Sequence, residues 1–224
     1  GKTGSISVLS KYLIPDHCKL VALGKPTEKE SKKWFKRYEK HLPNTGEIVF
    51  FDRSWYTRAL VEATMGYCSK RQYTYFMKNV IPWEKKQIEG GVEFFKFYLS
   101  IEKNTQQKRI DKRATSPLVY WKISENDLKM LDKWDAFTLY KEQMFKRTSY
   151  DEAPWVVLNA NNKKVAILSA LRFILNSFDY PDKDLPKPKI WSEGLHNYKI
   201  RINKVLFENL SYQQYKTLRV FTDE

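Results

Sequence analysis

Four short segments rich in apolar, β-forming residues constrain the fold of this chain more than any other feature. They span residues 18–23, 47–52, 93–99 and 155–159, and each has the length of a buried strand. Longer stretches with apolar residues at helical spacing lie among them, at 4–14, 28–41, 70–89 and 162–177. Strands that alternate with helices predict an α/β fold with a parallel central sheet covered on both faces.

Proline and glycine mark the boundaries of these elements. Pro82 lies within 70–89 and predicts a kink or a new helix start, and Gly90-Gly91 ends that stretch. Three prolines in 181–189 indicate a linker, and residues 190–224 follow as an aromatic and basic segment. We therefore expect one domain over residues 1–180, followed by a linker and C-terminal appendage over 181–224.

The charge balance points to an anionic partner. The chain has 40 basic and 26 acidic residues, for a net charge of +14, which suits nucleic acid, an acidic membrane face or a phosphate-rich small molecule. The alternative is that the charge only maintains solubility. No segment approaches the roughly 20 apolar residues of a membrane helix, and the first residues do not resemble a secretion signal. Cys18 and Cys68 form no CxxC pair, so we expect a reduced, cytoplasmic protein that does not contact membranes.

The first residues match the end of a phosphate-binding loop. Gly1, Lys2 and Thr3 complete the pattern G-x-x-x-x-G-K-[ST], and a helix is expected from Gly4 onward. In such a loop the backbone N–H groups and the lysine bind phosphates, and the hydroxyl can reach Mg²⁺. Only half of the pattern is present, and the alternative is an ordinary flexible terminus. If it is such a loop, we expect that a strand and the first half of the loop precede Gly1 and are missing from this sequence.

A second candidate site follows the strand predicted at 47–52. That strand ends in Asp52, and Arg53 comes next. Ligands bind at the carboxyl edge of open parallel sheets. A carboxylate there can hold Mg²⁺, and an arginine offers a two-pronged donor to phosphate oxygens. The alternative is a surface ion pair of little energetic value.

A third candidate site is the basic stretch 102–122, in which we expect a helix around residues 102–115. Like charges four residues apart repel unless an anion lies across them. Because the stretch follows a strand, it has the position of a mobile lid that closes over transferring phosphates; the alternative is a solvated basic face. Only Glu102 and Asp111 oppose its basic residues, which are Lys103, Lys108, Arg109, Lys112, Arg113 and Lys122.

Together these sites resemble the family-2 polyphosphate kinases, from residue 1 to about residue 180. The resemblance rests on several blocks in a fixed order. They are Gly-Lys-Thr-Gly (1–4), Ala-Leu-Gly-Lys-Pro-Thr (22–27), Leu-Pro-Asn-Thr-Gly-Glu-Ile-Val-Phe-Phe-Asp-Arg-Ser-Trp-Tyr-Thr-Arg-Ala (42–59), Val-Glu-Ala-Thr-Met-Gly-Tyr-Cys (61–68), Pro-Leu-Val-Tyr-Trp-Lys-Ile-Ser (117–124) and Ala-Pro-Trp (153–155).

The resemblance implies a P-loop kinase fold close to thymidylate kinase: a three-layer sandwich with a parallel central sheet and a helical lid. It implies reversible, Mg²⁺-dependent phosphoryl transfer between inorganic polyphosphate and a nucleotide. The Ser-Trp-Tyr form at 54–56 is similar to members that act on nucleoside diphosphates, which implies ADP or GDP as acceptor. We also expect a homo-oligomer, a dimer or a tetramer.

The resemblance also implies roles for individual residues. Lys2, Asp52 and Arg53 would be catalytic, with Asp52 and Thr3 at the metal. The residues implied to bind nucleotide or phosphate are Gly1, Lys2, Thr3, Gly4, Lys25, Arg58 and Glu62. The lid residues implied to bind polyphosphate are Lys108, Arg109, Lys112, Arg113 and Lys122, and we expect Arg109 and Arg113 to grip the polyphosphate chain.

Two other functions remain open from the sequence. A nucleoside or nucleotide monophosphate kinase on the same fold would share the catalytic residues but would need a closed acceptor pocket rather than a basic track. A nucleic-acid-binding module without catalysis would stack bases on tryptophans, although aromatics at helical spacing are more often core. The tryptophans concerned are Trp34, Trp55, Trp121 and Trp134. We expect polyphosphate and nucleotide, not nucleic acid, to be the partners.

Overall fold

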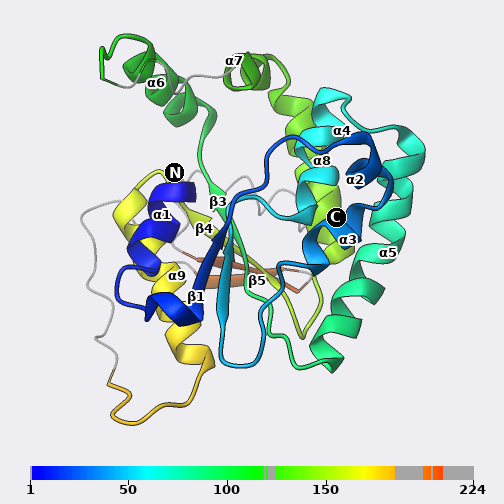
Figure 1. Ribbon diagram of the computed structural model, residues 1–224. Helices are drawn as coiled ribbons and strands as arrows, with labels where there is room; N and C mark the ends of the chain where they lie inside the picture. Colours follow the sequence, from blue (N-terminus) through cyan, green and yellow to red (C-terminus); the bar gives the residue numbers. More distant parts are fainter. Residues whose placement is uncertain (1, 119, 121–124, 185–198, 203, 209–224) are drawn as a thin grey trace. The chain divides into compact units, whose positions relative to one another are not determined.

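The computed structural model describes residues 2–118, 120, 125–184, 199–202 and 204–208 (Figure 1). The chain divides into two compact units. Unit 1 comprises Gly1–Phe94 and Tyr140–Thr148, and unit 2 comprises Phe95–Leu139 and Ser149–Glu224. None of the described helices is both long and apolar enough to span a bilayer.

Unit 1 is built around a short parallel sheet. Helix α1 (Lys2–Leu9) and the 3₁₀ turn η1 (Pro15–His17) lead into β1 (Cys18–Val21), which pairs with β2 (Ile48–Phe51). The register runs from Cys18 opposite Ile48 to Val21 opposite Phe51. The carboxyl ends of both strands therefore lie side by side, and the residues that follow them share one edge of the sheet.

The remaining helices of unit 1 have clear start and stop signals. Thr27 caps α2 (Glu28–Lys32) and Ser69 caps α5 (Lys70–Glu89), each in a reciprocal capping box with the residue three positions on. Gly66, at φ 74°, ends α4 (Val61–Met65), because a left-handed residue there is least costly for glycine. Between α2 and α4 lie α3 (Trp34–Glu39) and the 3₁₀ turn η2 (Trp55–Arg58).

Aromatic side chains form the core of unit 1. The ring centroid of Trp55 lies 4.9 Å from that of Trp83 and 5.5 Å from that of Phe94. Phe35 stacks on Trp83 at 5.0 Å, which joins α3 to α5. The Trp55 Nε1–H donates to Oε1 of Glu84 at 2.9 Å, and Glu84 is fully buried. This cluster fixes the segment that follows β2.

Unit 2 contains a second sheet with the strand order β3-β4-β6-β5. Strands β3 (Lys96–Ser100), β4 (Trp155–Asn159) and β6 (Val205–Glu208) are parallel, and β5 (Lys199–Ile202) is antiparallel to β6. Every residue of β4 is buried, as expected of a central strand. Helix α9 (Lys163–Ser177) packs on β4 and begins at Asn162, whose side chain accepts from two backbone N–H groups.

Three helices lie between β3 and β4 in the sequence. They are α6 (Lys103–Ala114), α7 (Glu125–Asp132) and α8 (Trp134–Thr148). Ile110 is the buried residue of α6, and the other side chains of this helix are exposed or half-buried. The polar composition of α6 therefore reflects its limited contact with the sheet.

The four predicted strands and the α/β class are confirmed, and the helix boundaries differ in three places. Residues 28–41 form two helices that break at Lys33, where φ is −115° and ψ is 56°. Helix α5 is continuous through Pro82, because buried residues on both sides of the proline hold it to the core. The first helix, expected over 4–14, runs from Lys2 to Leu9, whereas α6 ends at Ala114, close to the end of the helix expected around 102–115. The predicted appendage also contains β5 and β6, which extend the sheet beyond residue 180.

Candidate active site

The first turn of α1 meets the carboxyl end of β2. The Thr3 hydroxyl donates a hydrogen bond to Oδ2 of Asp52, across 49 positions of sequence. The backbone N–H of Asp52 donates to the Val21 carbonyl at 2.9 Å, which continues the β1–β2 ladder by one residue. The sheet thus fixes the Asp52 backbone beside the start of α1, and Asp52 lies at the carboxyl end of the strand, where the sequence predicted it.

Each residue of this contact has a basic neighbour in the sequence. Lys2 is the first residue of α1 and is exposed, as are Thr3 and Gly4 in the same turn. The N-terminal end of a helix carries a partial positive charge and unpaired N–H groups, so this turn suits an anion. Arg53 is exposed next to Asp52. Gly1, which was also predicted to bind phosphate, lies outside the described residues.

Arg53 adopts a backbone conformation that the sequence did not indicate. Its φ is +71°, one of three positive values at non-glycine residues among those described. The left-handed region costs an L-residue roughly 1–2 kcal/mol. Such strain tends to occur at functional sites, where it aims a side chain. Here it turns the chain directly after Asp52, before Ser54 caps the 3₁₀ turn η2.

The oxygen atoms at this site fit Mg²⁺. One carboxylate and one hydroxyl are in direct contact, and both are hard oxygen donors. Among the described residues, no group of three or more His, Cys, Asp or Glu side chains is placed to hold a metal by itself. Mg²⁺ is commonly held by one or two carboxylates with substrate phosphates and water. Asp52 and Thr3 are therefore a suitable protein contribution to such a site.

Arg58 and Glu62, predicted to bind nucleotide, lie inside unit 1. Arg58 is 1% exposed, and its Nε lies 2.9 Å from Oε2 of Glu62. Its Nη2 donates to the Ser31 carbonyl and hydroxyl, both at 3.2 Å, and its guanidinium lies 3.9 Å from the ring centroid of Trp34. Burial raises the pKa of Glu62, and the Arg58 charge opposes that effect. The structure does not support a direct nucleotide contact and favours a structural role for this pair.

Arg37 is a buried residue that the sequence analysis missed. It is 7% exposed, and its Nη2 donates to the Gly24 carbonyl at 2.5 Å. This bond ties α3 to the loop after β1, where the predicted phosphate ligand Lys25 lies exposed. The signal was present in the sequence, since Arg37 follows Trp34 by three residues and so lies on the same face of the helix as that aromatic residue.

The predicted lid residues on α6 differ in their surroundings. Lys108 and Lys112 are exposed, and Arg113 is half-buried. Arg109 instead donates from Nη2 to the carbonyls of Ala160 and Asn161, at 2.8 and 2.9 Å. Burial, with a smaller effect from Arg113, lowers its pKa. In this structure the Arg109 guanidinium therefore anchors α6 to the loop after β4, and its expected contact with polyphosphate stays a prediction. Lys122 lies outside the described residues.

The tryptophans argue against the nucleic-acid alternative. Trp34 and Trp55 are 6% and 4% exposed, and each indole N–H is hydrogen-bonded within unit 1. Trp134 is half-buried, and Trp121 lies outside the described residues. Neither of the two best-placed rings has a free face on which a base could stack.

Comparisons with known proteins agree on one family. The family model described as Polyphosphate kinase 2 matches residues 1–186. A Pseudomonas aeruginosa protein named GDP-polyphosphate phosphotransferase is 45% identical over 185 residues, 82% of this chain and 52% of the relative. Polyphosphate kinase PPK2B of Corynebacterium glutamicum is 42% identical over 200 residues, 87% of this chain and 65% of the relative.

A solved structure supports the same assignment. Polyphosphate Kinase 2 from Arthrobacter aurescens TC1 superposes with a TM-score of 0.75 at 29% identity, over 84% of this chain and 68% of that structure. The present chain spans between about half and two thirds of the length of the two curated relatives described above. The matched region contains α1, β2 and the Thr3–Asp52 contact, and the chain belongs to the Polyphosphate kinase 2 family.

Proposed function

We propose that this chain catalyses reversible, Mg²⁺-dependent phosphoryl transfer between inorganic polyphosphate and a nucleoside diphosphate, ADP or GDP. The observation that carries the proposal is the contact between Thr3 and Asp52 at the edge of the sheet, with Arg53 next to it. Matched relatives are named GDP-, NDP- and ADP-polyphosphate phosphotransferases, which supports a diphosphate acceptor.

Each residue of the site has a role that its chemistry permits. Lys2 and the start of α1 neutralise phosphate oxygens, and Arg53 offers two parallel donors to one phosphate. Asp52 and Thr3 would hold Mg²⁺, which when bound neutralises charge on the phosphates. Phosphoryl transfer depends mainly on positioning and charge neutralisation rather than on a strong base. These few cationic and oxygen groups therefore suffice without a catalytic histidine.

Three further properties are part of the proposal. We propose that Lys108 and Lys112, which are exposed and lie four residues apart on α6, bind polyphosphate. We also propose a homo-oligomer, a dimer or a tetramer, and a cytoplasmic location.

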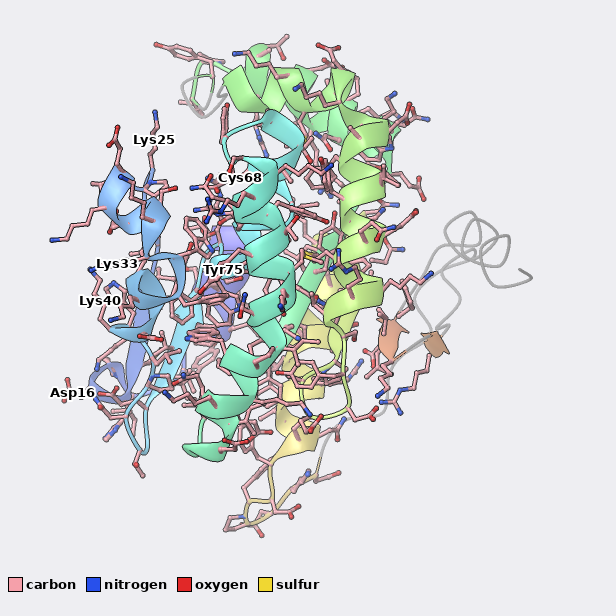
Figure 2. All side chains as sticks on the ribbon, turned by 90° about the vertical axis from the view of Figure 1, so that its right-hand side faces the viewer. Asp16, Lys25, Lys33, Lys40, Cys68 and Tyr75 are labelled. Carbon is pink, nitrogen blue, oxygen red and sulfur yellow. The ribbon has the colours of Figure 1, made fainter. Side chains whose placement is uncertain are left out.

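The test is ATP formation by the full chain from Mg²⁺, ADP and long-chain polyphosphate. Asp52→Asn should keep the fold and lower the rate by about a hundredfold or more, because a metal-held charge on the transferring group contributes several kcal/mol. Asp16→Asn is a matched control, since Asp16 is exposed in η1 at the opposite end of β1. Figure 2 shows Asp16 and Lys25, which flank β1, well separated.

Two outcomes would overturn the proposal. The first is transfer from ATP to a nucleoside monophosphate with no use of polyphosphate, which would favour the monophosphate kinase. The second is an Asp52→Asn variant with the activity of the unchanged chain at saturating Mg²⁺, because the site would then not use the carboxylate at the end of β2.

A further inference from the structure

The connection between β1 and β2 carries an exposed row of lysines that the active site does not use, apart from its first member. It begins in the loop after β1 and continues along α2 and α3. All six side chains are exposed: Lys25, Lys29, Lys32, Lys33, Lys36 and Lys40. We call this set the lysine row. A solvated basic face would need no further explanation, so the argument depends on how these charges are arranged and balanced.

The fold of α3 turns its lysines to one side. Trp34, Arg37 and Tyr38 are buried against unit 1, so the opposite face points to solvent. Lys33, Lys36 and Lys40 fall on that face, spaced three and four residues apart. In Figure 2 the labelled lysines Lys25, Lys33 and Lys40 follow one another along the same margin of this segment. The row is therefore continuous from the loop to the end of α3.

The nearby carboxylates are already engaged. Glu30 accepts from the backbone N–H of Thr27 at 2.9 Å and lies 3.7 Å from Arg37. Glu39 accepts from Trp83 Nε1 at 2.7 Å. Of the acidic residues on α2 and α3, Glu28 alone remains exposed without such a bond to a described residue. Within the part of the chain that the structure describes, no carboxylate lies within ion-pair distance of any member of the lysine row.

This arrangement has a cost that a bound anion would remove. Like charges three or four residues apart on a helix destabilise it. The neighbouring carboxylates do not offset these charges, because Glu30 is bonded to Thr27 at the start of α2 and Glu39 to Trp83. A row of phosphates spaced along a chain matches a row of ammonium groups, whereas a compact ligand would meet only one or two of them. The row therefore fits an extended polyanion.

The lysine row starts at the candidate active site. Lys25 lies four residues beyond Val21, and the Val21 carbonyl accepts from the N–H of Asp52. The Arg37–Gly24 bond holds α3 to the same loop. The row thus leads away from the edge of the sheet that carries Asp52. An extended substrate held at that edge would meet the row where it leaves the site.

We propose that the lysine row is an accessory binding surface for long-chain polyphosphate, which holds the part of the polymer that extends beyond the reacting phosphates. The proposal rests on the proposed function for the identity of the polymer. It adds a determinant of chain length, because short polyphosphate would not reach the outer lysines on α3 whereas long polyphosphate would.

The experiment compares two triple variants of the full chain. One is Lys33→Gln/Lys36→Gln/Lys40→Gln in the lysine row. The matched control is Lys70→Gln/Lys78→Gln/Lys86→Gln, which removes the same charge from exposed positions on α5 in the same unit. The KM for long-chain polyphosphate and for tripolyphosphate, the KM for ADP and the direct binding of fluorescently end-labelled long-chain polyphosphate are measured at two salt concentrations.

We expect the row variant alone to raise the KM for long-chain polyphosphate, by about three- to tenfold, since each screened surface contact contributes modestly. The KM for tripolyphosphate and for ADP should change much less, and the salt dependence for the long polymer should weaken. If both triple variants lose affinity equally, the effect is only the field of the whole +14 chain, and the proposal is overturned. An unchanged KM for the long polymer in the row variant would also overturn it.

Two further outcomes show whether the lysine-row proposal fails by itself or together with the proposed function. If the unchanged chain forms no ATP from polyphosphate, the proposed function fails, and the binding measurement then decides on the surface alone. Loss of labelled-polyphosphate binding in the row variant but not in the control would still support it. If the row variant loses binding of single-stranded poly(U) while its binding of polyphosphate is unchanged, the row is a nucleic-acid surface and the proposal is wrong.

Discussion

Replacing Arg58 by methionine should unfold this protein more readily without acting on the nucleotide site. Methionine retains much of the aliphatic volume of arginine but removes the guanidinium, which is 1% exposed and lies 2.9 Å from Glu62. The carboxylate of Glu62 would then stay buried without its counter-charge. Removing one partner of a buried ion pair costs about 3–5 kcal/mol, a large part of the roughly 5–15 kcal/mol that stabilises a typical domain.

The assay is denaturant unfolding at constant slope, so that a shift of the midpoint reports the free energy of unfolding. Arg71→Met, at an exposed position on α5, is the control and should change stability by less than about 0.5 kcal/mol. The double variant Arg58→Met/Glu62→Met should recover much of the loss, since replacing both members of a buried pair by apolar residues is often close to neutral. The KM for ADP should not change in variants that remain folded.

The pH dependence of the free energy of unfolding provides a second test of the Arg58–Glu62 pair. Burial raises the pKa of Glu62, and Arg58 opposes this rise, so the Arg58→Met variant should have an even higher Glu62 pKa. A carboxyl with a raised pKa disfavours the fold once it ionises, and that cost is absent when it is protonated. The deficit of Arg58→Met should therefore shrink as the pH falls through the folded pKa of Glu62. An unchanged midpoint together with a raised KM for ADP would refute this reasoning and restore the nucleotide-binding interpretation.

Three further predictions address the edges of both units. Arg53→Gly should abolish most transfer while leaving the free energy of unfolding unchanged or up to about 1 kcal/mol higher, because glycine relieves the positive φ; a less stable variant in denaturant unfolding would contradict this. The hydrogen-bonded ion pair with Lys19 on β1 is the largest of the effects that lower the pKa of Glu47, from 4.5 to about 2. The stabilisation of the fold by this ion pair should therefore be complete above pH 4.5 and lost as the pH falls towards 2. Unfolding curves of Glu47→Gln and the unchanged chain should then converge in acid, and a constant difference would be inconsistent with it. Lys108→Gln/Lys112→Gln should raise the KM for polyphosphate, whereas Arg109→Gln should mainly loosen α6, measured as faster amide exchange there; the reverse pattern would restore Arg109 as a ligand.

The first four strands could be predicted from the sequence because each is a short apolar run of residues that favour the extended conformation. Helix α9 was also expected from its helical spacing over 162–177, although its buried face consists of Val165, Ala166, Ser169 and Ala170 and not of its leucines. The break at Lys33 could not be read, because it depends on Arg37 reaching the loop after β1, a contact between residues distant in sequence. The continuity of α5 through Pro82 likewise depends on packing of Trp83 and Glu84.

The strands β5 and β6 were missed for a related reason. In this region basic and aromatic residues obscure the alternation of apolar and polar residues that would mark a strand. Strand β6 alternates buried and half-buried residues, but that pattern has meaning only once β4 is known to lie beside it. Local periodicity therefore predicts a helix or strand well only where its pattern of apolar residues is clear without knowledge of the neighbouring elements.

Two arginines five positions apart show what separates a ligand-binding charge from a structural one. Arg53 and Arg58 belong to one block of sequence, and the resemblance assigned both to phosphate or nucleotide. Arg58 has a carboxylate at i+4, Glu62, and the aromatic face of Trp34 above it, so its charge is balanced inside the fold. Arg53 has no acidic residue at i+3 or i+4 and follows the strand directly, which leaves its guanidinium exposed at the edge where anions bind. An arginine after a strand is therefore best assigned to a ligand only when its helical neighbours offer no counter-charge.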